Sequence, residues 1–101
     1  FVAPPVPVEG LYAAVTRRTL DGRHPDGWIR AQRISLEEAL RAYTVAAAYG
    51  SFEESIKGCL APGFLADIVI LDRDLFAVPP ADLREAQVVA TLVGGTVVHQ
   101  R

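Results

Sequence analysis

Three runs of mostly β-branched apolar residues, all in the last third of the chain, most constrain its fold. Residues 68–71 read Ile-Val-Ile-Leu, residues 88–93 read Val-Val-Ala-Thr-Leu-Val, and residues 96–98 read Thr-Val-Val. Each run predicts a strand, and the Gly94-Gly95 pair predicts a two-residue hairpin turn. The unbroken apolar run at 68–71 predicts a strand buried on both faces. Three such strands do not cover themselves, so we expect more strands or a second layer.

Helical patterns occur mainly before these strands, which predicts an α+β arrangement. Apolar residues at positions 8, 11, 12 and 15 predict a helix over residues 8–18, with Arg17 and Arg18 in its last turn. A capping box from Ser35 to Glu38 predicts a second helix that ends near Gly50. The predicted apolar face of this second helix consists of Leu36, Ala39, Leu40, Tyr43, Ala46 and Ala47.

The connections carry turn-forming residues. Residues 19–34 form a loop longer than most connections in compact domains, and Trp28 within it predicts that the loop is anchored. The Ala61-Pro62-Gly63 sequence predicts a type II turn. Residues 79–84 predict one or two helical turns, and the three prolines of residues 1–7 predict an extended start.

Composition excludes several classes of protein. Ten basic and twelve acidic residues give a net charge of −2, and the arginines are too sparse for a nucleic-acid-binding stripe. The single cysteine excludes an internal disulfide and fits a cytoplasmic setting. We find no apolar run of the roughly 18 to 20 residues that a membrane helix needs. The chain has no methionine and begins with a bulky phenylalanine, so we expect it to come from a longer reading frame.

Four segments resemble the amidohydrolase superfamily. Residues 57–72, Lys-Gly-Cys-Leu-Ala-Pro-Gly-Phe-Leu-Ala-Asp-Ile-Val-Ile-Leu-Asp, are similar to the tail pattern of that family, and residues 93–98 are similar to its ending. Residues 11–18 and 35–44 resemble the amidohydrolase-3 branch, which includes N-substituted formamide deformylases. Two positions depart from the family pattern: Phe64 stands where many members have lysine, and Cys59 where serine or threonine is usual.

The resemblance implies a fold and a division of the chain. In this family a TIM (β/α)8 barrel holds the metal site, and segments from both chain ends build a composite β-sandwich. Residues 1–58 would then be the C-terminal helical edge of the barrel. Residues 59–101 would be the C-terminal strands of the sandwich, a small three-stranded sheet with a hairpin. The partner of both would be the N-terminal and barrel part of the parent chain.

The resemblance also implies chemistry that this chain does not supply alone. Family members hydrolyse non-peptide C–N bonds in amides and cyclic amides, using water activated by a divalent metal, most commonly zinc. The ligands include a His-x-His pair and further histidines, whereas this chain has only His24 and His99. We therefore predict no catalytic residue and no metal ligand in residues 1–101, and no metal in the chain by itself.

Two residues of the long loop are candidates for substrate binding. His24 is either an ordinary loop histidine or a substrate contact near the barrel mouth, and Trp28 is either a packing anchor or a substrate-stacking residue. We interpret His99 as a surface residue at a strand end. Asp67, Asp72 and Asp74 are interpreted as strand-edge and turn residues, and Cys59 as a buried or half-buried structural thiol.

Two hypotheses remain open. In the first, the chain is the non-catalytic C-terminal portion of a cytoplasmic metal-dependent amidohydrolase. In the second, it is a free-standing module that associates with itself or with a partner. Both predict an uncovered apolar patch around Leu11 and Leu40, and both predict a homo-oligomer, such as a dimer formed by pairing of sheet edges. Neither predicts binding to nucleic acid or to a membrane.

Overall fold

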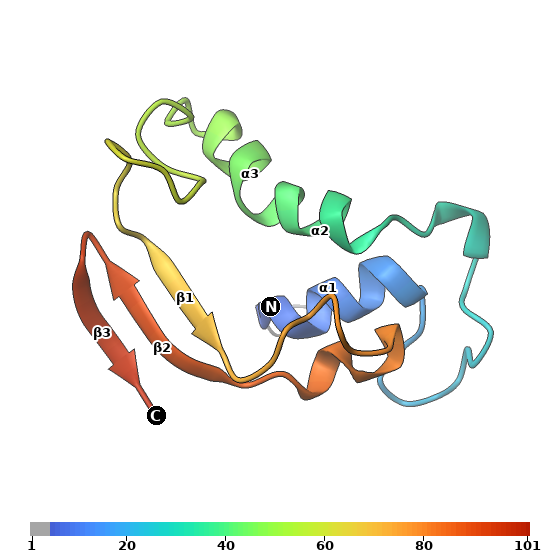
Figure 1. Ribbon diagram of the computed structural model, residues 1–101. Coiled ribbons are helices and arrows are strands. Elements are labelled where there is room, and N and C mark those ends of the chain that lie inside the picture. Colours follow the sequence, from blue (N-terminus) through green and yellow to red (C-terminus); the bar gives the residue numbers. More distant parts are fainter. Residues whose placement is uncertain (1–4) are drawn as a thin grey trace. The chain divides into compact units, whose positions relative to one another are not determined.

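The computed structural model describes residues 5–101 and confirms an α+β fold with a three-stranded antiparallel sheet. The helices are α1 (Pro7–Thr16), α2 (Leu36–Tyr43) and α3 (Val45–Gly50), with the short 3-10 helices η1 (Arg30–Gln32) and η2 (Pro80–Glu85). The strands are β1 (Ile68–Leu71), β2 (Val88–Val93) and β3 (Thr96–Gln100) (Figure 1). Of the predicted extended start, residues 1–4 lie outside the described part, and α1 already begins at Pro7.

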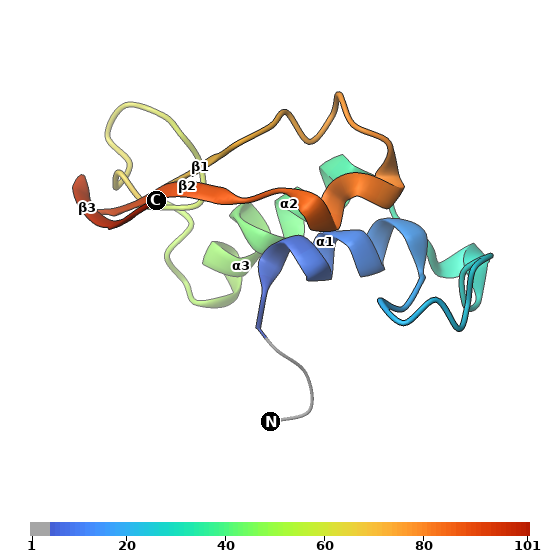
Figure 2. The same ribbon diagram turned by 90° about the horizontal axis from the view of Figure 1, so that it is seen from below.

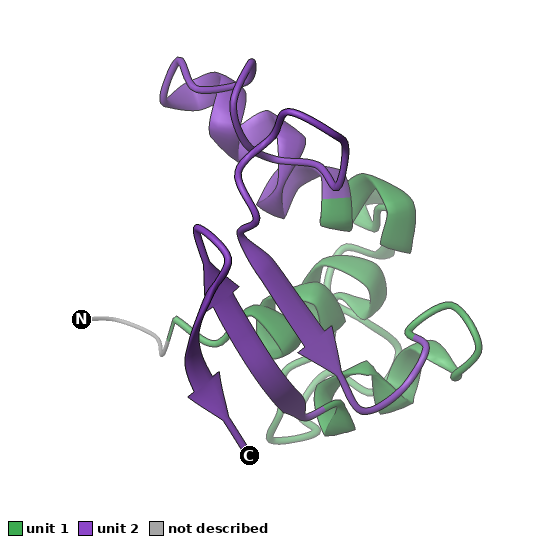
Figure 3. Ribbon diagram, turned by 60° about the vertical axis from the view of Figure 1, so that its left-hand side comes forward, with its two compact units in different colours: residues 1–40, 75–86 green, residues 41–74, 87–101 purple. Residues whose placement is uncertain are grey.

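The chain divides into two compact units, coloured separately in Figure 3. The first contains the residues up to Leu40 together with Leu75–Ala86, and the second contains Arg41–Asp74 together with Gln87–Arg101. In neither unit does any helix of residues 5–101 have the length and apolar character needed to cross a bilayer.

The core of the first unit joins α1 to η2, which lie side by side in Figures 1 and 2. Leu11 and Tyr12 on α1 are buried, as are Leu75, Leu83 and Ala86 around η2. The predicted apolar patch at Leu11 is therefore wrong, because only 4% of this residue is exposed. The sequence showed a helix with an open face, but a segment more than sixty residues later covers that face.

Helix α1 ends two residues earlier than predicted. Arg17 has a left-handed backbone (φ 57°), and its N–H donates to the Ala13 carbonyl, which stops the helix after Thr16. Arg17 and Arg18 therefore leave the helix instead of completing its last turn. The Thr16 hydroxyl donates to the Tyr12 carbonyl (2.7 Å) and accepts from the Arg18 N–H (3.1 Å), so this side chain also directs the chain away from the helix.

The predicted second helix is two helices in the structure. Its capping box is confirmed, because Ser35 N–H donates to Glu38 Oε1 and Glu38 N–H donates to Ser35 Oγ, both at 3.1 Å. The helix breaks at Thr44, whose backbone angles (φ −120°, ψ −88°) are not helical. Helix α3 then restarts with Ala48 buried, while Tyr43, Ala46 and Ala47 are exposed. The predicted apolar face does not continue into α3, where Ala48 is buried in place of Ala46 and Ala47, because the break at Thr44 changes the helical phase. Tyr43 was also predicted on this face, but it is exposed although it precedes the break.

A glycine packs against this break. Gly58 has φ 110°, and a Cβ there would lie 3.0 Å from Ala48 Cβ and 3.2 Å from Val45 Cα. A residue with a side chain would be strained at this φ and would crowd both atoms, so glycine suits this position best. The glycine of the Lys57-Gly58 motif therefore places the following loop directly on α3.

The sheet of the second unit has the order β1-β2-β3, with both pairs antiparallel. The predicted type II turn is confirmed before β1, since Phe64 N–H donates to the Ala61 carbonyl (3.1 Å) and Gly63 has φ 90°. The predicted hairpin turn is confirmed as well, with positive φ at Gly94 (56°) and Gly95 (83°), as a type I′ turn requires.

Burial of β1 differs from the prediction. Val69 is 55% exposed and Ile70 is 47% exposed, although the unbroken apolar run predicts a strand buried on both faces. The reason is that an antiparallel sheet can leave its faces open to solvent, and neither face of β1 is fully covered within residues 5–101. Since successive strand residues point to opposite faces, each face of β1 carries an exposed apolar side chain.

Candidate functional site

The long loop after α1 is anchored, as predicted, through Trp28. Its N–H donates to the Arg17 carbonyl (2.8 Å), and Arg17 Nε donates to the Trp28 carbonyl (3.0 Å). The Arg17 guanidinium also lies 5.3 Å from the centre of the indole ring, within the range of a cation–π contact. Trp28 nevertheless remains 57% exposed. Its backbone and one ring face serve the anchor, and its use in substrate stacking stays a prediction.

His24 lies apart from Trp28 in the same unit. It lines a cavity of about 200 Å³ together with Tyr12 and Arg84, and Trp28 is not among the residues that line this cavity. That volume is below the range of about 300 to 1,000 Å³ typical of ligand pockets. The structure therefore does not bring the two candidate substrate contacts into one pocket, and the role of His24 stays a prediction.

Arg84 is a structural residue of this cavity that the sequence analysis missed. Its guanidinium lies 5.1 Å from the centre of the Tyr12 ring, and its Nη1 donates to the Leu20 carbonyl at 3.3 Å. The donor and acceptor are separated by 64 residues, so no local pattern could have indicated the contact. Arg84 thereby ties η2 to the beginning of the long loop.

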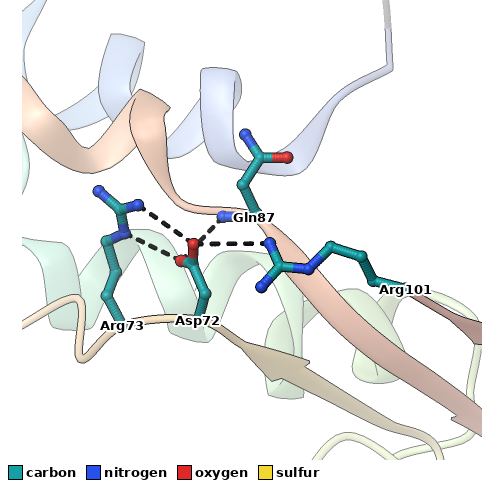
Figure 4. A network of polar contacts seen from close by, with 4 residues as sticks. All are labelled: Asp72, Arg73, Gln87 and Arg101. Carbon is teal, nitrogen blue, oxygen red and sulfur yellow. Dashed lines mark hydrogen bonds and ion pairs between the residues drawn. The ribbon is translucent and has the colours of Figure 1, made fainter.

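Asp72 forms the densest polar network of the second unit (Figure 4). Its carboxylate accepts a bidentate pair from Arg73 Nε (2.9 Å) and Nη2 (3.1 Å), and Oδ1 also accepts from the Gln87 N–H at 3.0 Å. Arg101 Nη1 lies 3.8 Å from Oδ2. The hydrogen bonds from Arg73, then the Gln87 N–H, with the charge of Arg101, lower the pKa of Asp72 to about 2.

This network fastens strands rather than preparing a proton donor. Asp72 N–H donates to the Gln87 carbonyl (2.9 Å), so residues 72 and 87 are joined by main chain as well as side chain where β1 ends and β2 begins. A carboxylate held ionised by two arginines is a poor general acid or base near neutral pH. The interpretation of Asp72 as a strand-edge residue is confirmed.

Asp67 performs the corresponding task at the other end of β1. Its Oδ1 accepts from the Gly94 N–H at 2.9 Å, while the Ala66 carbonyl accepts from the Gly95 N–H at 2.9 Å. The hairpin turn is thus fixed to the residues just before β1. Asp67 and Asp72 act at opposite ends of one strand, and they do not share a site.

Cys59 is not where the sequence analysis placed it. The thiol is exposed, in contrast to the predicted buried or half-buried structural thiol. It lines an open hollow of about 410 Å³ within the second unit, between residues of α3 and β1 that include Ala48 and Val69. The prediction rested on the general preference of cysteine for burial, and the glycine contact at residue 58 instead turns this segment outward.

The residues present do not fit a metal site. Across residues 5–101, we find no group of three His, Cys, Asp or Glu side chains placed to hold an ion. His24 belongs to the first unit, whereas His99 lies exposed in β3 of the second, paired across the sheet with Thr91. The carboxylates of Asp67 and Asp72 are already engaged in hydrogen bonds. No metal-dependent step is therefore assigned to the described side chains.

Comparison with known sequences gives one consistent family. The sequence model of the amidohydrolase family matches residues 1–99. The putative amidohydrolase YtcJ of Bacillus subtilis (strain 168) is 27% identical over 100 residues, which is 99% of this chain. The N-substituted formamide deformylase of Arthrobacter pascens is 35% identical over 97 residues, or 94% of this chain. Protein LONG AFTER FAR-RED 3 of Arabidopsis thaliana is 38% identical over 89 residues, or 88% of this chain.

These relatives are much longer than the present chain. The matched regions cover 19%, 17% and 15% of the three relatives, respectively. A solved structure agrees with the sequence matches: the amidohydrolase from Thermotoga maritima MSB8 superposes with a TM-score of 0.55 at 26% identity. That match covers 67% of this chain and 16% of the solved chain.

Proposed function

Because the chain belongs to the amidohydrolase family, we propose that it is the non-catalytic C-terminal portion of a metal-dependent amidohydrolase acting on non-peptide C–N bonds. Coverage is the observation that carries the proposal. At least 88% of the chain aligns with each of three relatives, yet the matches take up only 15–19% of their lengths. In a parent of the relatives' length, more than four fifths of the chain would lie outside this segment and could carry the catalytic residues.

The motif shared with the family supports a structural role for this region. Gly58 packs on α3, Pro62 and Gly63 form the turn before β1, Asp67 holds the hairpin, and Asp72 fastens β1 to β2. Each of these motif residues makes a contact that stabilises the local fold. A motif made of such residues supports a structural role for the segment rather than a reaction centre within it.

We further propose that residues 1–58 form the helical edge of a TIM barrel and residues 59–101 the C-terminal strands of a composite β-sandwich. Exposed apolar side chains on the strands support the idea that another part of the parent chain covers the sheet. Val69 is 55% exposed, Val97 53% and Val98 59%. The cover would come from the parent chain. The divalent metal, zinc in this proposal, would be bound by residues of the parent outside this segment, and the parent would act in the cytoplasm as a homo-oligomer.

The same exposed sheet favours one alternative function. A free-standing module could bury these apolar residues against a second copy or another protein. Because both hypotheses predict self-association, binding to the rest of the parent separates them. A fragment that needs its parent should bind the remaining part of that parent when the two are expressed separately, whereas a free-standing module should not.

Hydrolysis assays test the main proposal. The full-length protein should release amine from N-substituted formamides or open cyclic amides, and its activity should be lost on chelation and restored by zinc. The purified 101-residue chain, supplied with zinc at the same molar concentration, should neither release amine from N-substituted formamides nor open cyclic amides. Circular dichroism on the same sample establishes that it is folded. Stoichiometric zinc binding together with amide turnover by the chain alone would contradict the proposal.

A further inference from the structure

A second cavity in the first unit has the composition of an anion site. Its volume is about 330 Å³, within the range of small-ligand pockets, and three arginines line it: Arg18, Arg30 and Arg33. Asp26 is the one acidic residue among the lining side chains. The charges of these four side chains sum to +2. This cavity is distinct from the smaller one that contains His24 and Arg84, although Arg18 borders both.

The backbone places Arg18 at this cavity. The Thr16 hydroxyl, in a residue only 8% exposed, accepts from the Arg18 N–H at 3.1 Å. The left-handed turn at Arg17 takes the chain off the helix axis immediately before it. Arg18 therefore leaves the end of α1 in a fixed direction.

The other two arginines lie at the two ends of the 3-10 turn η1: Arg30 is its first residue, and Arg33 directly follows its last. The Arg33 N–H donates to the Arg30 carbonyl at 3.1 Å, which keeps the two residues close together. Arg33 Nε donates to the Arg30 carbonyl at 3.2 Å, and this bond orients its guanidinium. The turn is fixed to α1 on both sides, by Trp28 N–H to the Arg17 carbonyl (2.8 Å) and by Ile34 N–H to the Ala14 carbonyl (3.2 Å).

Asp26 is the one lining side chain that offsets part of this positive charge. Among the ion pairs of residues 5–101, none includes Arg18, Arg30 or Arg33. The remaining walls include Val15 and the Pro79–Pro80–Ala81 segment, which contribute no charge and little polarity. A cavity with a net positive charge attracts anionic counter-ions, and its less polar walls concentrate the electrostatic potential. Guanidinium groups, with their planar pairs of donors, suit carboxylate and phosphate oxygens.

We propose that the cavity lined by Arg18, Arg30 and Arg33 binds a small polyvalent oxyanion, a phosphate-bearing or dicarboxylate compound. The inference goes beyond the proposed function, because it concerns a binding site and requires no hydrolysis. Asp26 limits the affinity for highly charged anions.

Calorimetric titration of the full-length protein tests the site. The probes are inorganic phosphate and pyrophosphate in one arm and succinate in the other, all at constant ionic strength set with chloride, because screening weakens nonspecific attraction equally. We expect saturable binding of at least one probe. The arm that binds more tightly identifies the phosphate or the dicarboxylate class. Absence of saturable binding in both arms overturns the proposal.

Variants connect the binding to this cavity. Arg30→Gln and Arg18→Gln should each weaken binding about tenfold, the loss expected for one charge-assisted hydrogen-bonding group. Arg23→Gln is the matched control, because Arg23 lies in the same loop, pairs with Asp21 and does not line the cavity. Asp26→Asn should tighten binding about threefold, whereas Glu37→Gln, with the same change in net charge outside the cavity, should not.

The outcomes separate the site from general electrostatics and from the proposed function. Equal losses in Arg23→Gln and Arg30→Gln, or equal gains in Asp26→Asn and Glu37→Gln, overturn the proposal. Far-UV circular dichroism of each variant confirms an unchanged fold before its affinity is compared. Because binding is measured directly, an inactive hydrolase with an intact anion site contradicts only the proposed function, and an active hydrolase without anion binding contradicts only this inference.

Discussion

Gly27→Ala is the substitution with the clearest expected cost. Gly27 has φ 85°, and a Cβ there would lie 2.6 Å from the Thr16 carbonyl oxygen, a backbone atom that cannot rotate away. The left-handed conformation costs a non-glycine residue about 1 to 2 kcal/mol. Displacing the main chain to relieve the contact adds roughly 1 to 3 kcal/mol, as in overpacked cores. We expect a total of about 2 to 5 kcal/mol.

Loops open at a lower free energy than the packed core, so we expect the loop to open before the unit unfolds. Opening removes the hydrogen bonds between Trp28 and Arg17 and the contact of the guanidinium with the indole ring. Trp28 is the only tryptophan of the chain, so its fluorescence reports this loop alone. In Gly27→Ala we expect stronger quenching by acrylamide and a lower urea midpoint for the tryptophan signal than for the far-UV circular dichroism signal.

Gly22→Ala is the control within the same loop. Gly22 also has a positive φ (76°), but no atom lies within 4 Å of the Cβ position. Only the conformational cost of about 1 to 2 kcal/mol applies there. The difference between the two variants isolates the close approach of Gly27 to α1. If both variants shift the tryptophan midpoint equally, the packing of the loop against Thr16 has been misjudged.

Three further substitutions test contacts within the individual units. Asp72→Asn should remove a pH dependence of stability. The pKa of Asp72 falls from 3.8 to about 2 on folding, so its contribution to stability is present above pH 4 and disappears as the pH falls toward 2. Urea unfolding measured between pH 4 and pH 2 should show this loss of stability in the unsubstituted protein and not in the variant. Arg84→Ala should lower the free energy of unfolding by about 1 to 2 kcal/mol, because the contacts with Tyr12 and Leu20 are lost. The control is Arg23→Ala: the Arg23 side chain is 82% exposed, so in the same chemical denaturation experiment the change should be less than about 0.5 kcal/mol. Ser35→Ala should cost about 1 kcal/mol and reduce the helical signal in circular dichroism, while Ser51→Ala, outside the capping box, leaves the start of α2 intact.

Cysteine exposure and helix continuity show where sequence patterns failed. The apolar spacing from Leu36 to Ala47 described one helix, but Thr44 interrupts it where Gly58 packs alongside. Cys59 is exposed beside that glycine, although cysteines are more often buried. The helix prediction failed because a segment ten to fifteen residues further along the chain packs at the break, and helical periodicity carries no information about it. The cysteine prediction failed because a general preference for burial carries no information about where this segment lies.

The sequence by itself determined the local elements and the family. The Ser35–Glu38 capping box, the Pro62-Gly63 turn, the Gly94-Gly95 hairpin and the β-branched strands all act through residues within a few positions of one another, so their signals are legible without a fold. Only the tertiary structure decided which distant groups meet. It covered Leu11 with η2, joined Arg84 to Leu20, placed Asp72 against Gln87 and gathered Arg18, Arg30 and Arg33 around one cavity. Such contacts depend on how the elements pack, because the free energy of burial selects among arrangements that local propensities leave equally open.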